Sequence, residues 1–78
     1  MEELIGYLAS NNKLSKILAV LDSKGAMNSQ SIAKTTRIVG VDKNIEELVE
    51  KNLLVLKSGK YHLTNKGEKV IHMLRNMR

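Results

Sequence analysis

Apolar residues recur at helical spacing in five stretches of the chain, which are separated by short runs rich in Ser, Asn and Gly. Residues three, four and seven positions apart lie on one face of a helix, so each stretch is predicted to form a helix with one buried side. We expect helices over residues 1–9, 13–23 and 29–36, one that starts near Val41, and one that follows Thr64. The apolar faces comprise Leu4, Ile5 and Leu8; Leu14, Ile17, Leu18 and Leu21; Ile32 and Ala33; Val41, Ile45, Leu48 and Val49; and Val70, Ile71, Met73, Leu74 and Met77.

Polar residues at the ends of these stretches are typical helix signals. Asn28 is predicted to cap the helix that follows it, because its side-chain oxygen can accept a hydrogen bond from a free amide of the first turn. Asn52 follows the last apolar turn of the fourth helix, and Asn tolerates the left-handed conformation that ends many helices. Thr64 or Asn65 is predicted to cap the last helix. With Asn65 as the cap, Glu68 would complete a capping box.

After Asn52 the pattern changes from helical to extended, which predicts a β-hairpin. Residues 53–57 and 60–63 are expected to form its strands, and Ser58-Gly59 its two-residue turn, because Gly readily takes a positive φ. Residues 26–27 are expected to form a short extended link. The predicted order is therefore helix, helix, extended link, helix, helix, hairpin, helix.

The chain has 78 residues and no Cys. This length fits one domain, and neither a disulfide nor a thiolate metal site can supplement its small core. No apolar run approaches the roughly 20 residues that span a bilayer. The N-terminus begins with acids rather than with the basic segment of a secretory signal. We therefore expect the chain to remain inside the cell and to make no contact with a membrane.

The net charge favours an anionic partner. The chain contains 13 Lys and Arg against 8 Asp and Glu, for a formal charge of +5, and nucleic acid is the first candidate. A small domain also uses net charge for solubility alone, so the charge by itself does not identify the partner.

Three segments resemble a known family: SIAKTTRI at residues 31–38, IEELVEKNLL at 45–54 and KYHLTNKG at 60–67. They are similar to the small winged-helix domains of archaeal and bacterial transcription regulators, and the leading MEELIGYLASNNKLSKIL is closest in style to the archaeal ones. The resemblance covers nearly the whole chain. It implies a mainly α fold with a small β-hairpin, a winged helix-turn-helix, as one DNA-binding domain over residues 1–78. The chain departs from the family in its shorter turn before Val41 and in Asn52, where Gly is usual.

The resemblance places three parts of the chain on the DNA side: the turn between the third and fourth helices, the start of the fourth helix, and the hairpin. The candidate DNA-binding residues are Ser29, Gln30, Lys34, Arg37, Lys43, Asn44, Lys57 and Lys60. Cationic side chains and the groups at a helix N-terminus are common phosphate ligands. Each of these residues is also typical of an ordinary solvated surface. A charge change at Lys13, in the second helix, is expected to matter less.

The fourth helix, which reads bases in a helix-turn-helix, is acidic in this chain. Residues 41–51 contain four acids against Lys43 and Lys51, a charge of −2, so the rest of the chain carries +7. Carboxylates repel phosphates, which argues against simple DNA reading by this helix. Glu47 can instead pair with Lys43 and Lys51, as on a solvated face. An acidic helix can also be a contact for a partner protein.

The remaining polar and aromatic residues carry weaker signals. Tyr61 shares a strand face with Leu63, so it is expected to pack in the core rather than to stack on a base. His62 lies on the polar strand face, where it can reach a phosphate or remain in solvent. Glu68 and His72 are four residues apart, but two ligands alone do not make a metal site. No catalytic arrangement, cofactor motif or small-molecule site is indicated, so we do not expect an enzyme.

The terminal helices carry more apolar residues than one small core needs. Leu4 and Leu8, with Met73 and Met77, are predicted to form a homodimer interface, because a chain of this size gains most from added burial. Packing of the two ends within one chain is the alternative. We therefore expect a homodimeric, DNA-binding transcription regulator of the cytoplasm that is associated with the nucleoid. The alternative function is a winged helix that binds proteins within a transcription complex or another assembly.

Overall fold

The computed structural model describes residues 2–76, which form a mainly helical fold with one two-stranded antiparallel hairpin. The elements are α1 (Glu2–Ala9), α2 (Asn12–Lys24), α3 (Ser29–Thr36), α4 (Val41–Glu50), β1 (Leu54–Lys57), β2 (Lys60–Leu63) and α5 (Asn65–Arg75). Their order is the predicted one, and each element begins within one residue of its predicted start. None of the helices in the described residues is long and apolar enough to cross a membrane.

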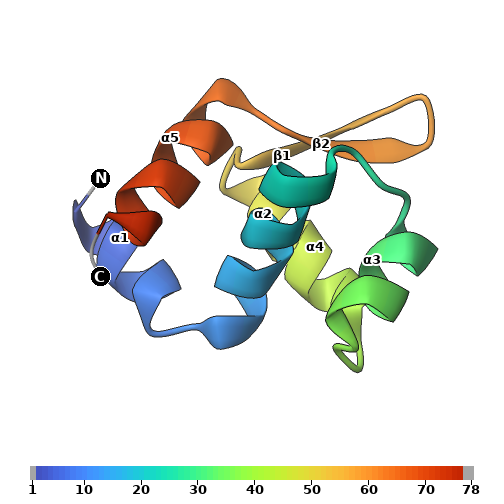
Figure 1. Cartoon of the computed structure of the whole chain (residues 1–78), viewed down its shortest axis with the longest axis horizontal. Helices are drawn as coiled ribbons and strands as arrows, with labels where there is room; N and C mark the ends of the chain where they lie inside the picture. The colour runs from blue at the N-terminus through green and yellow to red at the C-terminus, as the bar shows by residue number, and fades with distance from the viewer. Residues whose placement is uncertain (1, 77–78) are drawn as a thin grey trace.

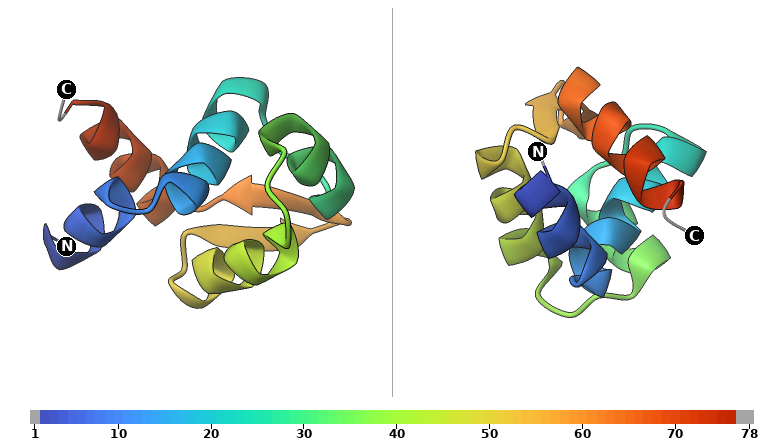
Figure 2. Two further views of the ribbon diagram at one scale, coloured as in Figure 1. Left: turned by 90° about the horizontal axis from the view of Figure 1, so that it is seen from below. Right: turned by 90° about the vertical axis from the view of Figure 1, so that its left-hand side faces the viewer.

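Helix α2 is the centre of the fold. It contacts α1, α3, α4, α5 and β2, and in Figure 1 it stands between the terminal helices on the left and α3 on the right. Its buried residues lie at the predicted helical spacing: Leu14, Ile17, Leu18 and Leu21. Helices α1 and α5 also pack on each other, so both ends of the chain lie on the same side of the molecule, as the left view of Figure 2 shows.

The hairpin continues past the helices that support it (Figure 1). Leu54 pairs with Leu63 next to the core, and Leu56 pairs with Tyr61 one step nearer the tip. Leu54 is 2% exposed, whereas Leu56 is 54% exposed. The core therefore covers the first of these two pairs but leaves part of the second in solvent.

The hairpin is fixed by a tight turn at its tip and by backbone hydrogen bonds to Met27. At the tip, Ser58 and Gly59 have φ of 52° and 78°, and a tight turn of type I′ requires a positive φ at both positions. Nearer the core, the amide and carbonyl of Met27 bond to the carbonyl and amide of Tyr61 at 3.3 and 2.7 Å. This bridge confirms the extended link predicted at residues 26–27.

Asparagine residues begin and end helices where the sequence predicts. The side-chain oxygen of Asn28 accepts a hydrogen bond from the Ser31 amide at 2.8 Å. Asn52 adopts a left-handed conformation with φ of 62°. This conformation lets the Leu53 amide donate to the Leu48 carbonyl at 2.9 Å, which closes α4 in a Schellman motif.

The last helix is capped by Thr64 rather than by Asn65. The Thr64 hydroxyl oxygen accepts from the Gly67 amide at 2.9 Å, and the hydroxyl donates to the Asn52 carbonyl at 2.6 Å. Asn65 is the first residue of α5, so the alternative of a capping box between Asn65 and Glu68 is wrong. Thr64 is favoured because one hydroxyl both caps α5 and ties it to the end of α4.

Candidate nucleic-acid interface

Residues 37–40 form the turn between α3 and α4, and Arg37 begins it in the left-handed region, with φ of 58° and ψ of 29°. Its amide closes α3 by donating to the Ala33 carbonyl at 2.8 Å. Glycine is the usual residue in this position, because a side chain there costs roughly 1–2 kcal/mol. The Arg37 side chain is exposed, so its guanidinium group is accessible from solvent.

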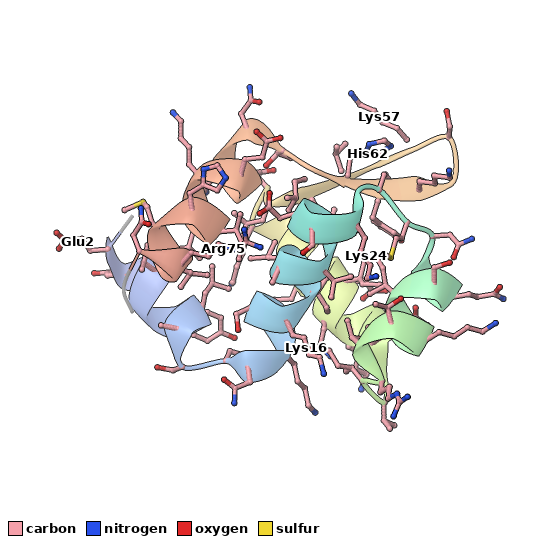
Figure 3. All side chains as sticks on the ribbon, in the orientation of Figure 1. Glu2, Lys16, Lys24, Lys57, His62 and Arg75 are labelled. Atoms are coloured by element: carbon pink, nitrogen blue, oxygen red, sulfur yellow. The ribbon has the colours of Figure 1, made fainter. Side chains whose placement is uncertain are left out.

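Arg37 shares a surface hollow with two lysines of α2. This turn hollow has a volume of about 400 Å³ and is lined by Asn12, Lys13, Lys16, Thr36, Arg37, Ile38 and Val39. The three cationic side chains are exposed, and none of them forms a salt bridge within residues 2–76. Figure 3 shows Lys16 near the N-terminal end of α2, on the side toward α3. Three positive charges around one hollow make it a suitable site for an anionic group.

Lys13 therefore lies beside Arg37 and not apart from it, contrary to what its place in the sequence suggested. The contact between α2 and α3 brings the start of α2 to the α3–α4 turn. Lys16, which is not among the predicted DNA contacts, lines the same hollow. The signal that could have found it is the spacing of Lys13 and Lys16, which puts both on one helical face away from the apolar residues.

Lys57 and Lys60 form a second, separate group of cations. They pair across the strands next to the hairpin tip, and both are exposed. Side chains alternate along a strand, so this pair lies on the face opposite to Leu56 and Tyr61. In Figure 3, Lys57 stands on the outer side of the hairpin, at the opposite end of the view from Lys16. The predicted DNA contacts are therefore distributed over two places.

The other predicted phosphate ligands lie along α3 and the start of α4. Gln30, Lys34 and Lys43 are exposed, and Ser29 and Asn44 are half-buried. Lys34 lies in the last turn of α3, close in sequence to the turn hollow, and Lys43 lies in the first turn of α4. Lys34 and Lys43 thus lie on the two helices that flank the α3–α4 turn.

The acidic side of α4 is divided into two parts. Glu47 accepts a hydrogen bond from the Tyr7 hydroxyl of α1 and pairs with Lys51 at 3.7 Å. This hydrogen bond to the carboxylate favours the neutral phenol and raises the pKa of Tyr7. The Lys51 ammonium also lies 5.2 Å from the centre of the Tyr7 ring. Glu47 thus has partners inside the chain, whereas Glu46 and Glu50 are exposed.

The predicted dimer-interface residues differ in how far they are buried within their own chain. Leu8 is fully buried in the core of its own chain, so it is not available on the surface for a second copy. Leu4 is half-buried and packs against the same core. Met73 is 43% exposed, and Met77 lies outside the described residues. Of the predicted interface residues that the structure describes, Met73 is the one with a large exposed surface.

Two weaker candidates can also be placed. Tyr61 packs against the core, as its strand face predicts. Glu68 and His72 are both exposed. Within residues 2–76, no group of three or more His, Cys, Asp or Glu lies close enough together to hold a metal ion.

No family model, curated protein or solved structure matches this chain. Its function is therefore inferred from its own residues.

Proposed function

We propose that this protein is a winged-helix DNA-binding protein that acts in transcription regulation. In this assignment α3 and α4 are the helix-turn-helix, and the β1–β2 hairpin is the wing. The observation that carries the proposal is the group of Lys13, Lys16 and Arg37 around the turn hollow. Backbone phosphates supply much of the affinity of DNA-binding proteins, and three free cations at one hollow suit a phosphate.

The distribution of charge supports a duplex as the ligand. Residues 23–41 and 51–67, on either side of α4, contain seven Lys and Arg and no acid. A duplex presents two lines of phosphates, one on each side of a groove. Separate cation groups at the turn hollow and at the hairpin fit such a partner better than they fit a single small anion.

Helix α4 takes part through its first turn. Lys43 lies there, and the first turn of the second helix is the part that usually approaches the bases. Glu46 and Glu50 lie in the second half of α4 and are left outside the proposed contact. With one lysine near the groove, most of the affinity is assigned to phosphates, so we expect modest preference among DNA sequences.

The direct test is a titration of a fluorescently labelled duplex at several salt concentrations, read by anisotropy. Binding at low salt is expected, with a slope of log affinity against log salt of about −3 or steeper, because each neutralised phosphate contributes about −0.9. Absence of binding at low salt would contradict the proposed DNA-binding function. Binding with little salt dependence would mean that phosphates are not the main ligands.

We further propose that two copies of the protein bind DNA together through the face formed by α1 and α5. Replacing Met73 with glutamate is expected to shift the protein toward monomer without unfolding it, because Met73 is exposed in the single chain. Sedimentation at micromolar concentration measures this. As a matched control, glutamate in place of His72, which is also exposed on α5, should leave the dimer intact. A wild-type chain that sediments as a monomer would contradict the proposal.

A further inference from the structure

A second hollow, here called the α4–hairpin hollow, lies between α4 and the core-facing side of the hairpin. It has a volume of about 290 Å³ and is lined by Glu46, Val49, Glu50, Leu56 and Tyr61. Val49 is 37% exposed, although its spacing in α4 predicted a place on the buried face. The hollow therefore combines apolar side chains with two exposed carboxylates.

The fold leaves part of this apolar surface in solvent for a geometric reason. Leu56 and Tyr61 form the pair of the hairpin that extends past the covered Leu54 pair. Val49 lies at the edge of the apolar side of α4, next to that pair. Leu56 keeps more than half of its surface in solvent, and the exposed apolar side chains lie together rather than singly. An apolar patch with a polar rim is typical of an interaction surface.

The two carboxylates give the hollow a local negative charge. Glu46 and Glu50 are four residues apart on α4, where like charges destabilise a helix. Neither forms a salt bridge within residues 2–76, unlike Glu47, which is paired with Lys51. In a chain of net charge +5, this local pair of free acids favours a partner that supplies positive charge.

These properties limit what can occupy the hollow. Phosphates of nucleic acid or of an anionic membrane would be repelled by Glu46 and Glu50. Pockets for drug-sized ligands begin at about 300 Å³, so the hollow is at the small end for such a molecule. It is suited instead to apolar side chains presented by a protein segment, with cations on either side of them.

We propose that the α4–hairpin hollow binds a basic amphipathic helix of a partner protein. Apolar side chains of that helix contact Val49, Leu56 and Tyr61, and its Lys or Arg residues pair with Glu46 and Glu50. The site is separate from the turn hollow that carries the proposed DNA contact, and the inference does not depend on DNA binding. It would connect a DNA-bound regulator to a second protein.

The probe is a synthetic helical peptide with leucines at positions i, i+4 and i+7 and lysines on both flanks, titrated into the ¹⁵N-labelled full chain. Amide shifts are expected to concentrate at Val49, Glu50, Leu56 and Tyr61. Two control peptides define specificity: one with glutamates in place of the lysines, and one with the same composition but no continuous apolar face. Shifts centred elsewhere, or equal binding of either control, would overturn the proposal.

Variants of the protein provide the second arm. Leu56→Ser and Glu50→Lys are each expected to weaken peptide binding about fivefold or more, because both remove a central contact. Both residues are exposed, so the fold should be retained. Glu68→Lys, a charge reversal of an exposed acid on α5, is the matched control and should have little effect. Unchanged peptide binding in Leu56→Ser and Glu50→Lys would contradict the site.

Two further measurements test whether the hollow is separate from the DNA-binding site and whether a second copy of the chain occupies it. Duplex DNA binding by Glu50→Lys should be as strong as that of the wild type or stronger, because an acid is replaced by a cation. A loss of DNA binding in this variant would contradict the separation of the two sites. Sedimentation without peptide should be the same for Leu56→Ser and the wild type. A change would show that a second copy of the chain occupies the hollow, which would also overturn the proposal.

Discussion

Replacing Arg37 with glutamate is expected to lower the affinity for duplex DNA about tenfold at low salt and to reduce the salt slope by about one. The guanidinium group lies exposed at the turn hollow with Lys13 and Lys16. The variant removes one phosphate ligand and puts a repulsive charge beside the two that remain. Titration of several unrelated duplexes should give similar losses, because a phosphate contact carries no sequence information. Fluorescence anisotropy at matched salt concentrations measures both quantities.

The matched control is Lys69→Glu, which makes the same change of charge on α5. Lys69 is exposed on α5 and is not among the residues that line the turn hollow. Lys13→Glu should behave like Arg37→Glu, because Lys13 lines the same hollow. An equal loss in Lys69→Glu and Arg37→Glu would mean that only the net charge matters and that the DNA-binding face is wrongly placed.

A second variant separates the charge of Arg37 from its role in the backbone. Arg37→Gly removes the cation but relieves the left-handed strain, which is roughly 1–2 kcal/mol for a residue with a side chain. Its melting temperature should therefore be at least that of the wild type, while its affinity for DNA falls. A variant that melts higher and binds DNA unchanged would show that Arg37 is not a ligand.

Replacing Gly67 with alanine is expected to destabilise the fold by about 3 kcal/mol, which lowers the melting temperature by roughly 15 °C. A Cβ at this position would overlap the Leu53 carbonyl oxygen and lie 3.3 Å from a methyl carbon of Leu63. The backbone cannot easily move aside. The Leu53 carbonyl accepts from the Thr64 amide at 3.1 Å, and the Gly67 amide donates to the Thr64 hydroxyl.

The control for this substitution is Gly6→Ala in α1. Gly6 is also helical, but a Cβ there meets nothing within 4 Å. Alanine favours a helix interior over glycine by about 1 kcal/mol, so Gly6→Ala should raise the melting temperature by a few degrees. Thermal unfolding followed by circular dichroism compares the two variants. A Gly67→Ala protein as stable as the wild type would contradict the close approach of the Leu53 carbonyl to α5.

The sequence by itself determined the local structure of this protein. Helical spacing of apolar residues predicted the five helices, and the cap at Asn28 and the left-handed Asn52 followed from the hydrogen bonds that Asn can make near its own backbone. Ser58-Gly59 marked the turn of the hairpin, because a two-residue turn requires positive φ. These features depend on residues within a few positions of one another, so the sequence contains the information needed to predict them.

The tertiary structure decided everything that depends on which elements meet. Thr64 caps α5 while its hydroxyl donates a hydrogen bond to the Asn52 carbonyl, twelve positions away. Lys13 and Arg37 line one hollow because α2 packs on α3, and Glu47 has a hydrogen-bond partner because α1 brings Tyr7 to it.

The spacing of apolar residues also does not determine which of them are buried. It shows which side of an element is apolar, but it does not show whether a neighbour covers that side. Val49 and Leu56 have ordinary places in their patterns and are still partly exposed, because they line the α4–hairpin hollow, which no other described part of the chain fills. Leu8 has the same kind of place and is fully buried, because it lies where the helices of the chain form the core. The contact between elements, and not the pattern within one, determined which apolar residues remain available to a partner.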